Sequence, residues 1–243
     1  GNDFMIANIA ELEKDGFELT RENVSELAQK ICDRHYGIGA DGLILLDATQ
    51  TNRPGFGNYI EDLKADVRFY GTNSDGSQFE MTGNGLRCFA QYASEKGFGV
   101  TGTLGSKKVT VETLAGTKSV LLSKKDEQNF GVVDMGELIF EPDKIPYNGQ
   151  DPLDVPIKLL DKERKAMTLN SGIPHWVVIV DSMNELNSPD LADQALEARF
   201  DSRFPRQVNV SVVYIENDCH VHARVFERGA NETLSCGTGA TAI

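Results

Sequence analysis

Two short stretches of this 243-residue chain each carry one small side chain directly before a Gly-x-Gly hinge and an apparent helix. The first is QFEMTGNGLRCF at 78–89, where Thr82 precedes the hinge, and the second is NETLSCGTGATA at 231–242, where Cys236 does. A helix N-terminus exposes unpaired N–H groups and about half a positive charge, so it can hold a carboxylate. A thiol at that position has its pKa lowered from about 8.5, which predicts that Cys236 reaches its thiolate form near neutral pH.

Two such corners facing one another would hold one carboxylate from both sides. The donors would be the backbone amides of Gly83, Asn84, Gly237 and Thr238. A thiolate on one face of an α-carbon and a thiol on the other could remove a proton and return it to the opposite side, while the held carboxylate absorbs the enolate charge. This chemistry inverts an amino-acid stereocentre, and we expect no cofactor for it.

The elements that position these corners can be read from the spacing of apolar residues. Both halves of the chain show the same order of strands followed by a hinge and a helix, which predicts two similar α+β units, 1–117 and 118–243. Helices are expected over 21–35, from the first hinge to Gly97, and near 190–199. Strands are expected at LILLD (43–47), 65–71, 107–116, 119–135, 175–181, 207–215 and 219–227.

Composition excludes several classes of partner. The formal charge of -13 argues against nucleic acid and anionic membranes as partners. The four cysteines are scattered without CxxC spacing, which predicts a reduced, cytoplasmic protein without a disulfide framework. Cys219, His220 and His222 alternate on one expected strand and lack a fourth ligand, so no metal site is expected. The longest aliphatic runs are too short to cross a bilayer.

Several motifs together resemble the diaminopimelate epimerases, pyridoxal-independent enzymes of lysine and peptidoglycan synthesis. The resemblance implies two pseudo-symmetric domains, each a curved, mostly antiparallel sheet wrapped around a central helix, with the active site in the cleft between them. It implies epimerisation of L,L-diaminopimelate to meso-diaminopimelate by thiol acid/base proton transfer at the α-carbon. The matching segments follow the family's order over nearly the whole chain: GNDF (1–4), RHYGIGADGL (34–43), NSDGSQFEMTGNGLRC (73–88), PH (174–175), FPRQVNV (204–210) and ERGANETLSCGTGATA (227–242).

The resemblance also assigns roles to single residues. Cys236 matches one of the family's two catalytic cysteines, and His175 and Glu227 match residues that support catalysis. An acid with two charged ends needs a cation and amide groups at its far end, and the planar guanidinium of Arg228 suits a carboxylate there. The residues implied to hold the distal amino and carboxylate groups are Asn2, Asn73, Asn209, Glu227 and Arg228. Those implied to hold the reacting carboxylate are Gly83, Asn84, Gly237 and Thr238.

Three positions depart from the family pattern. Thr82 stands where the family has its first catalytic cysteine, and Ile173 and Asn231 replace an Asn and a Gly. A hydroxyl is a far weaker acid than a thiol, so we expect two-base epimerisation to be lost or severely slowed. This leaves open a one-base lyase or dehydratase, a racemase of another amino acid, or a binding protein without turnover. The expected partner is a small diamino-dicarboxylate, and homodimer formation is left open.

Plainer structural roles compete with these assignments. Taken alone, Cys236 would be a small buried residue before a glycine turn, and His175 a hydrogen-bonding residue at the start of a strand. Asn73 would be a turn residue, and the pair Glu227-Arg228 would lie at the surface. The family motifs around these residues favour the functional roles.

Overall fold

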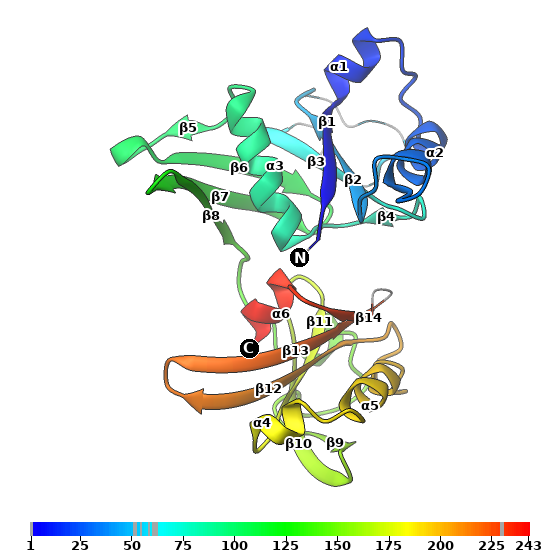
Figure 1. The fold of residues 1–243 in the computed structure, drawn as a ribbon, viewed down its shortest axis with the longest axis vertical. Helices are drawn as coiled ribbons and strands as arrows, with labels where there is room; N and C mark the ends of the chain where they lie inside the picture. The colour runs from blue at the N-terminus through cyan, green and yellow to red at the C-terminus, as the bar shows by residue number, and fades with distance from the viewer. Residues whose placement is uncertain (1, 51–52, 54, 58, 60–62, 229–230) are drawn as a thin grey trace. The chain divides into compact units, whose positions relative to one another are not determined.

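Two separate sheets form the framework of the chain, one in residues 2–134 and one in residues 135–243 (Figure 1). The computed structural model describes residues 2–50, 53, 55–57, 59, 63–228 and 231–243. The sequence interpretation placed the boundary after Thr117, which lies inside β7 (Gly116–Lys125). This strand pairs with β6 and β8, both in the first unit, and the chain divides after Asp134.

The sheet of the first unit has the order β1-β2-β3-β6-β7-β8, with β4 paired to β3 and β5 to β6. The pairs β1/β2 and β3/β6 are parallel, and the other pairs are antiparallel. The remaining strands are β1 (Phe4–Asn8), β2 (Gly42–Asp47), β3 (Val67–Asn73), β4 (Gln78–Phe79), β5 (Val100–Thr101), β6 (Lys107–Thr113) and β8 (Gln128–Asp134). The helices are α1 (Ile9–Lys14), α2 (Arg21–Cys32) and α3 (Gly83–Glu95), with a 3₁₀ turn at Thr103–Gly105.

Strand β2 is buried on both faces because helices cover each side of it. Its even-numbered residues Ile44 and Leu46 pack in one cluster with Phe89 of α3. Its odd-numbered residues Leu43 and Leu45 pack in a second cluster with Ala28 of α2. The two-residue period of a strand therefore splits one apolar run between two cores, and this holds α3 against the sheet.

A buried ion pair links two strands of the first sheet. Arg68 on β3 is 0% exposed and donates from Nε to Oε2 of Glu112 on β6 at 2.7 Å. The same guanidinium donates through Nη1 to the carbonyl of Thr49 at 3.1 Å. A charge in such a place is tolerated because its partner and its hydrogen bonds are all present.

The sheet of the second unit has the order β14-β13-β12-β11-β10-β9, in which only the β11/β12 pair is parallel. Its strands are β9 (Val155–Leu159), β10 (Lys162–Asn170), β11 (Pro174–Ile179), β12 (Asn209–Asn217), β13 (His220–Glu227) and β14 (Asn231–Thr233). Its helices are α4 (Met183–Leu186), α5 (Leu191–Ala198) and α6 (Gly237–Ala242), with a 3₁₀ turn at Pro142–Lys144.

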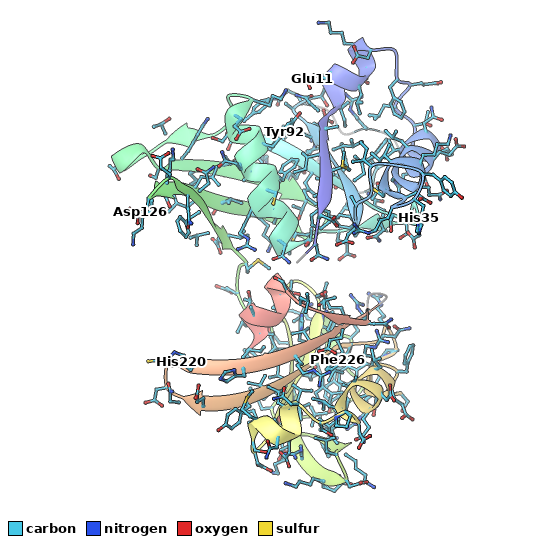
Figure 2. All side chains as sticks on the ribbon, in the orientation of Figure 1. Glu11, His35, Tyr92, Asp126, His220 and Phe226 are labelled. Carbon is cyan, nitrogen blue, oxygen red and sulfur yellow. The ribbon has the colours of Figure 1, made fainter. Side chains whose placement is uncertain are left out.

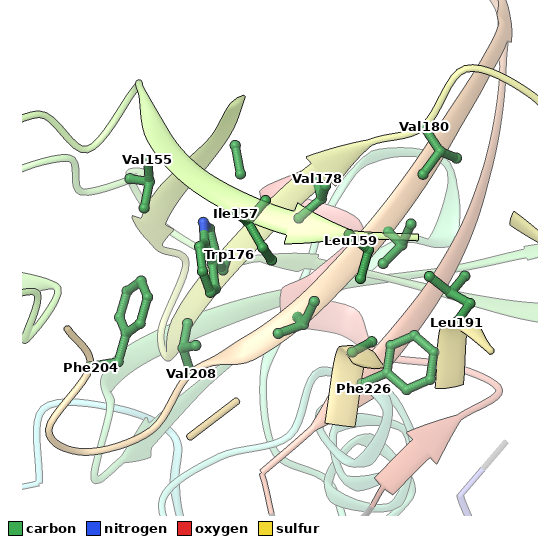
Figure 3. Close-up of a cluster of buried hydrophobic side chains, with 14 of the residues drawn as sticks. Val155, Ile157, Leu159, Trp176, Val178, Val180, Leu191, Phe204, Val208 and Phe226 are labelled. Carbon is green, nitrogen blue, oxygen red and sulfur yellow. The ribbon is translucent and has the colours of Figure 1, made fainter. Parts of the chain in front are cut away.

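Alternate residues of β11 serve different faces of this sheet. Trp176 lies fully buried in the larger core, with its ring 5.1 Å from that of Phe204 (Figure 3). Its neighbour Val177 points to the opposite face, where it clusters with Val213 and with Ala242 of α6. The strand thus ties the core to the face that carries α6.

The predicted fold class is confirmed: both units are α+β with mostly antiparallel sheets. Element boundaries differ by a few residues, as for the helix expected over 21–35, which ends at Cys32. Within the part of the chain described, no helix is long and apolar enough to cross a membrane.

Candidate active site

Cys236 occupies the N-cap of α6, as the hinge pattern predicted. Its extended backbone (φ -129°, ψ 113°) leads from β14 into the helix, and its Sγ accepts a hydrogen bond from the N–H of Gly239 at 3.2 Å. The Oγ1 of Thr238 lies 3.3 Å from the same sulfur. A Cβ on Gly239 would lie 3.3 Å from Sγ, so the thiol rests closely against the first turn.

The predicted lowering of the Cys236 pKa is wrong. Burial raises the pKa of this thiol to about 11, and the negative charge of the nearby Glu227 carboxylate adds to the rise. The contacts of the sulfur with the Thr238 hydroxyl and with the Gly239 N–H act in the opposite direction and are too weak to compensate. Near neutral pH the residue is therefore a thiol, the form that can donate a proton.

His175 at the start of β11 is 0% exposed, and both of its ring nitrogens have partners. Nε2 lies 2.9 Å from Oγ1 of Thr238, and Nδ1 lies 3.3 Å from Oγ of Ser211 on β12. Burial, with a smaller contribution from the positive charge of Arg228, lowers the pKa of His175 to about 3. The imidazole is neutral at physiological pH, and Thr238 connects it to the thiol.

Glu227 ends β13 beside this group, and Arg228 follows it in the next turn. The hydroxyl of Thr233 donates to Oε1 of Glu227 at 2.5 Å. The backbone N–H of Arg228 donates to Oδ1 of Asn209 at 2.8 Å, and its Nη1 donates to the carbonyl of Arg206 at 3.1 Å. The second unit therefore gathers all of its predicted site residues in one place: His175, Asn209, Glu227, Arg228, Cys236, Gly237 and Thr238.

Thr82 occupies the matching N-cap of α3 in the first unit, again with an extended backbone (φ -140°, ψ 129°). Unlike Cys236, its side chain makes no capping hydrogen bond. Its Cγ2 methyl lies against the helix instead, where a Cβ on Gly85 would come within 2.4 Å of it. The methyl group thus takes the place that the sulfur of Cys236 takes against Gly239.

The first turn of α3 is connected to the start of the chain. Nδ2 of Asn84 donates to Oδ1 of Asn2 at 3.1 Å, and Nδ2 of Asn2 donates to Oδ2 of Asp41 at 3.1 Å. Arg34 donates in turn to Oδ1 of Asp41 at 2.8 Å and to Oδ1 of Asp3 at 2.7 Å. The predicted site residues Asn2, Gly83 and Asn84 therefore lie together, held by an ion-pair cluster.

Asn73 ends β3, where it pairs with Gly42, the residue next to Asp41. Its Nδ2 donates to Oγ of Ser77 at 2.9 Å, and its carbonyl accepts from the N–H of Gly76. The structure thus shows its role in the 73–77 turn, and its contact with substrate stays a prediction. The same is true of the prediction that the corners of the two units share one site.

The two histidines that follow Cys219, His220 and His222, make local contacts near the tip of the β12–β13 hairpin, where Figure 2 labels His220. Nδ1 of His220 lies 3.1 Å from Oδ1 of Asn217, and Nε2 of His222 lies 3.0 Å from Oε2 of Glu216. Among the residues that the structure describes, no group of three or more His, Cys, Asp or Glu side chains could hold a metal ion.

Comparison with known proteins gives the family. The sequence profile of diaminopimelate epimerase matches residues 1–141 and 167–243. The chain belongs to the diaminopimelate epimerase family. It is 37% identical to the diaminopimelate epimerase of Desulforapulum autotrophicum over all of its length and 78% of that protein's. It is also 37% identical to that of Carboxydothermus hydrogenoformans, covering 79% of that protein.

Solved structures share the fold at low identity. A probable proline racemase from Agrobacterium radiobacter has a TM-score of 0.58 and 18% identity, over 90% of this chain and 63% of that one. A Bacillus anthracis phenazine biosynthesis protein of the PhzF family has a TM-score of 0.58 and 17% identity, over 99% of this chain and 72% of that one. Both show the architecture alone.

The structure shows the backbone surroundings of two residues at which this member of the diaminopimelate epimerase family departs from the family pattern. Asn231 has φ +58°, a left-handed conformation that glycine adopts freely and asparagine tolerates better than other side chains. Ile173 lies in the turn before Pro174, where its carbonyl accepts from the N–H of Ser171. The motif residues Gly1, Gly229 and Ala230 lie outside the described part of the chain.

The sequence did not predict the neighbouring residues that hold the predicted site residues in place by hydrogen bonds. Asp41 and Arg34 lie inside the matching segment RHYGIGADGL, but only the structure shows their contacts with Asn2 and with each other. Ser211 follows Asn209 by two positions on β12, so the strand period places both on one face. That spacing was the available signal for Ser211.

Proposed function

We propose that this chain binds diaminopimelate and catalyses its pyridoxal-independent epimerisation at the α-carbon, at a rate severely reduced by Thr82. The observation that carries the proposal is the arrangement of Cys236 at the α6 N-terminus, with Glu227, Thr238 and His175 around it, in a chain of this family. These residues supply one acid/base group together with its surroundings.

The raised pKa of Cys236 defines its part in the reaction. A thiol with a pKa of about 11 holds its proton at neutral pH and can donate it to a carbanion at the α-carbon. Glu227, whose charge disfavours the thiolate, promotes return of a proton to sulfur after each transfer. The backbone amides of Gly237 and Thr238 would hold the carboxylate on which the negative charge develops.

Inversion also requires a base for the opposite face of the α-carbon. The matching helix start of the first unit carries Thr82, whose hydroxyl does not lose its proton near pH 7. The proton-donating half of the mechanism is therefore present, and the proton-abstracting half lacks its thiolate. Direct measurement distinguishes slow epimerisation from one-base exchange, elimination or binding alone.

The distal end of the substrate would be held by Arg228, Asn209 and Glu227. Anchoring of the Arg228 guanidinium through Nη1 restricts its side chain, which lowers the entropy lost on binding a carboxylate. Asn2 and Asn73 of the first unit complete the proposed set. We further place the protein in the cytoplasm, without a nucleic-acid or membrane partner; four free cysteines and a charge of -13 support this.

The test is restoration of the missing thiol. Thr82→Cys removes the methyl group packed against Gly85 and puts a sulfur where the other corner already accommodates one. Incubation of each diaminopimelate isomer in deuterated water should give inverted, α-deuterated product with this variant. Thr82→Ser is the matched control, since it also removes the methyl group but supplies no thiol, and we expect it to stay as slow as the parent.

Other outcomes lead to other functions. Deuterium incorporation without inversion in the parent protein would indicate one-base chemistry. Elimination from an amino acid that carries a leaving group on its β-carbon would indicate a lyase. A folded Thr82→Cys protein that is inert toward both diaminopimelate isomers would refute the proposed function.

A further inference from the structure

The buried imidazole of His175 has a defined set of hydrogen-bonding neighbours. Nδ1 faces Oγ of Ser211 at 3.3 Å, and Nε2 faces Oγ1 of Thr238 at 2.9 Å and Nδ2 of Asn209 at 3.5 Å. Because the ring is fully buried and neutral, it carries one proton, and its neighbours decide which nitrogen holds it.

Asn209 decides between the two tautomers. The backbone N–H of Arg228 can only donate, and it donates to Asn209 at 2.8 Å, which fixes the amide oxygen on that side. The NH₂ group of Asn209 is then the part that faces Nε2. An NH₂ group that faces Nε2 repels an N–H there and favours the unprotonated form of that nitrogen, which puts the ring proton on Nδ1 with Oγ of Ser211 as its acceptor.

The same logic sets the direction of the next hydrogen bond. An unprotonated Nε2 accepts from the hydroxyl of Thr238 at 2.9 Å, and a hydroxyl has one proton to give. Once that proton points to His175, Thr238 presents only lone pairs to the sulfur of Cys236, 3.3 Å away. The thiol is then the donor in that contact.

We propose that Ser211 and Asn209 hold His175 as its Nδ1–H tautomer, so that His175 is a fixed acceptor for the Thr238 hydroxyl and not a proton carrier. Ser211 is a positioning residue in this arrangement, because it acts on the thiol through His175 and Thr238, whereas the Thr238 hydroxyl contacts the sulfur directly. The contribution to epimerisation rests on the proposed function, whereas the tautomer and the direction of the hydrogen bonds do not.

Histidine tautomers can be read directly from the ¹⁵N shifts of the two ring nitrogens in the intact protein. A long-range ¹H–¹⁵N spectrum at pH 7 should show His175 with a protonated Nδ1 and an unprotonated Nε2. The three other histidines, His35, His220 and His222, can be replaced together by Gln, which leaves the His175 signals alone in the spectrum. A protonated Nε2 would overturn the proposal, because Thr238 would then accept from His175 and donate to sulfur.

Variants test each contact by a signal that general loosening of the fold would not reproduce. Thr238→Val removes the donor to Nε2, so the Nε2 resonance should move downfield, and Thr238→Ser should restore its position. Ser211→Ala should move the Nδ1–H proton upfield, because its acceptor is lost. An Nε2 resonance that is identical in Thr238→Val and the parent would show that the hydroxyl does not donate to His175.

The catalytic consequence is measured in the Thr82→Cys background. There, Thr238→Val should lower kcat more than it raises KM, and Thr238→Ser, which keeps the hydroxyl, should recover most of the lost kcat. If the expected tautomer is found in an inert Thr82→Cys protein, the proposed function fails and the hydrogen-bond arrangement stands. If the tautomer is the other one in an active protein, the arrangement fails and the function stands.

Discussion

Part of the acid sensitivity of the 135–243 unit should come from one residue, His175. In the folded unit its pKa is about 3, against 6.5 for an exposed imidazole, because burial disfavours the cation. Between these values the unfolded chain binds a proton that the folded chain does not, so stability falls as the pH falls from 6.5 toward 3. Each pH unit in this range costs about 1.4 kcal/mol.

The size of the effect at a practical pH follows directly. Between pH 7 and pH 5 the imidazole should remove about 2 kcal/mol from the free energy of unfolding. This figure would hardly change if the folded pKa were one unit higher, because the ring would still be almost wholly neutral at pH 5. A neutral His175→Gln variant lacks the titration and should lose about 2 kcal/mol less over the same range.

Trp176 provides the assay, since it is the chain's single tryptophan and is fully buried in the core of this unit. Urea unfolding followed by its fluorescence at pH 7 and pH 5 gives the two free energies for the parent and for His175→Gln. Carboxylates titrate in both proteins, so comparing the two pH dependences isolates the imidazole. Equal pH dependence in the two proteins would refute the assignment of a neutral, buried His175.

Two further predictions concern other charges. Burial contributes most to the raised pKa of Cys236, and the charge of Glu227 adds to it, so Glu227→Gln should lower this pKa and speed alkylation of the thiol by iodoacetamide at pH 8. Peptide mass spectrometry measures Cys236 separately from the exposed Cys88 and Cys219, which serve as internal references. An unchanged rate of alkylation would contradict the influence of Glu227. Glu112→Ala should cost about 3–5 kcal/mol by chemical denaturation, because it removes the buried carboxylate that accepts from Nε of the fully buried Arg68. A loss below about 1 kcal/mol would show that this ion pair adds little to stability.

The fold was predictable to the extent that it depends on periodicity. The apolar runs of β2 and β11 and the hinges before α3 and α6 appear directly in the sequence, and the structure has the elements at those places. Boundaries were less predictable because pairing decides them: β7 stays with the first unit through hydrogen bonds to β6 and β8, which no local pattern around Thr117 encodes.

The candidate site was predictable in its residue types but not in its electrostatics. Position at a helix start suggested a low pKa for Cys236, whereas burial and Glu227 raise it. Such a result depends on how deeply the thiol is enclosed and on which carboxylate lies next to it, and both are set by tertiary packing. For the same reason, Ser211 and Asp41 became recognisable only through their contacts.

The alternation of His175 and Trp176 along β11 couples chemistry to folding. A slip of one residue in the pairing with β12 would exchange an imidazole for an indole on both faces of the sheet. The arrangement around the thiol therefore cannot loosen by local fraying of this strand while the tryptophan core stays intact. In evolution, insertions or deletions between Ser171 and Pro174 would be selected against twice, once for the chemistry and once for the fold.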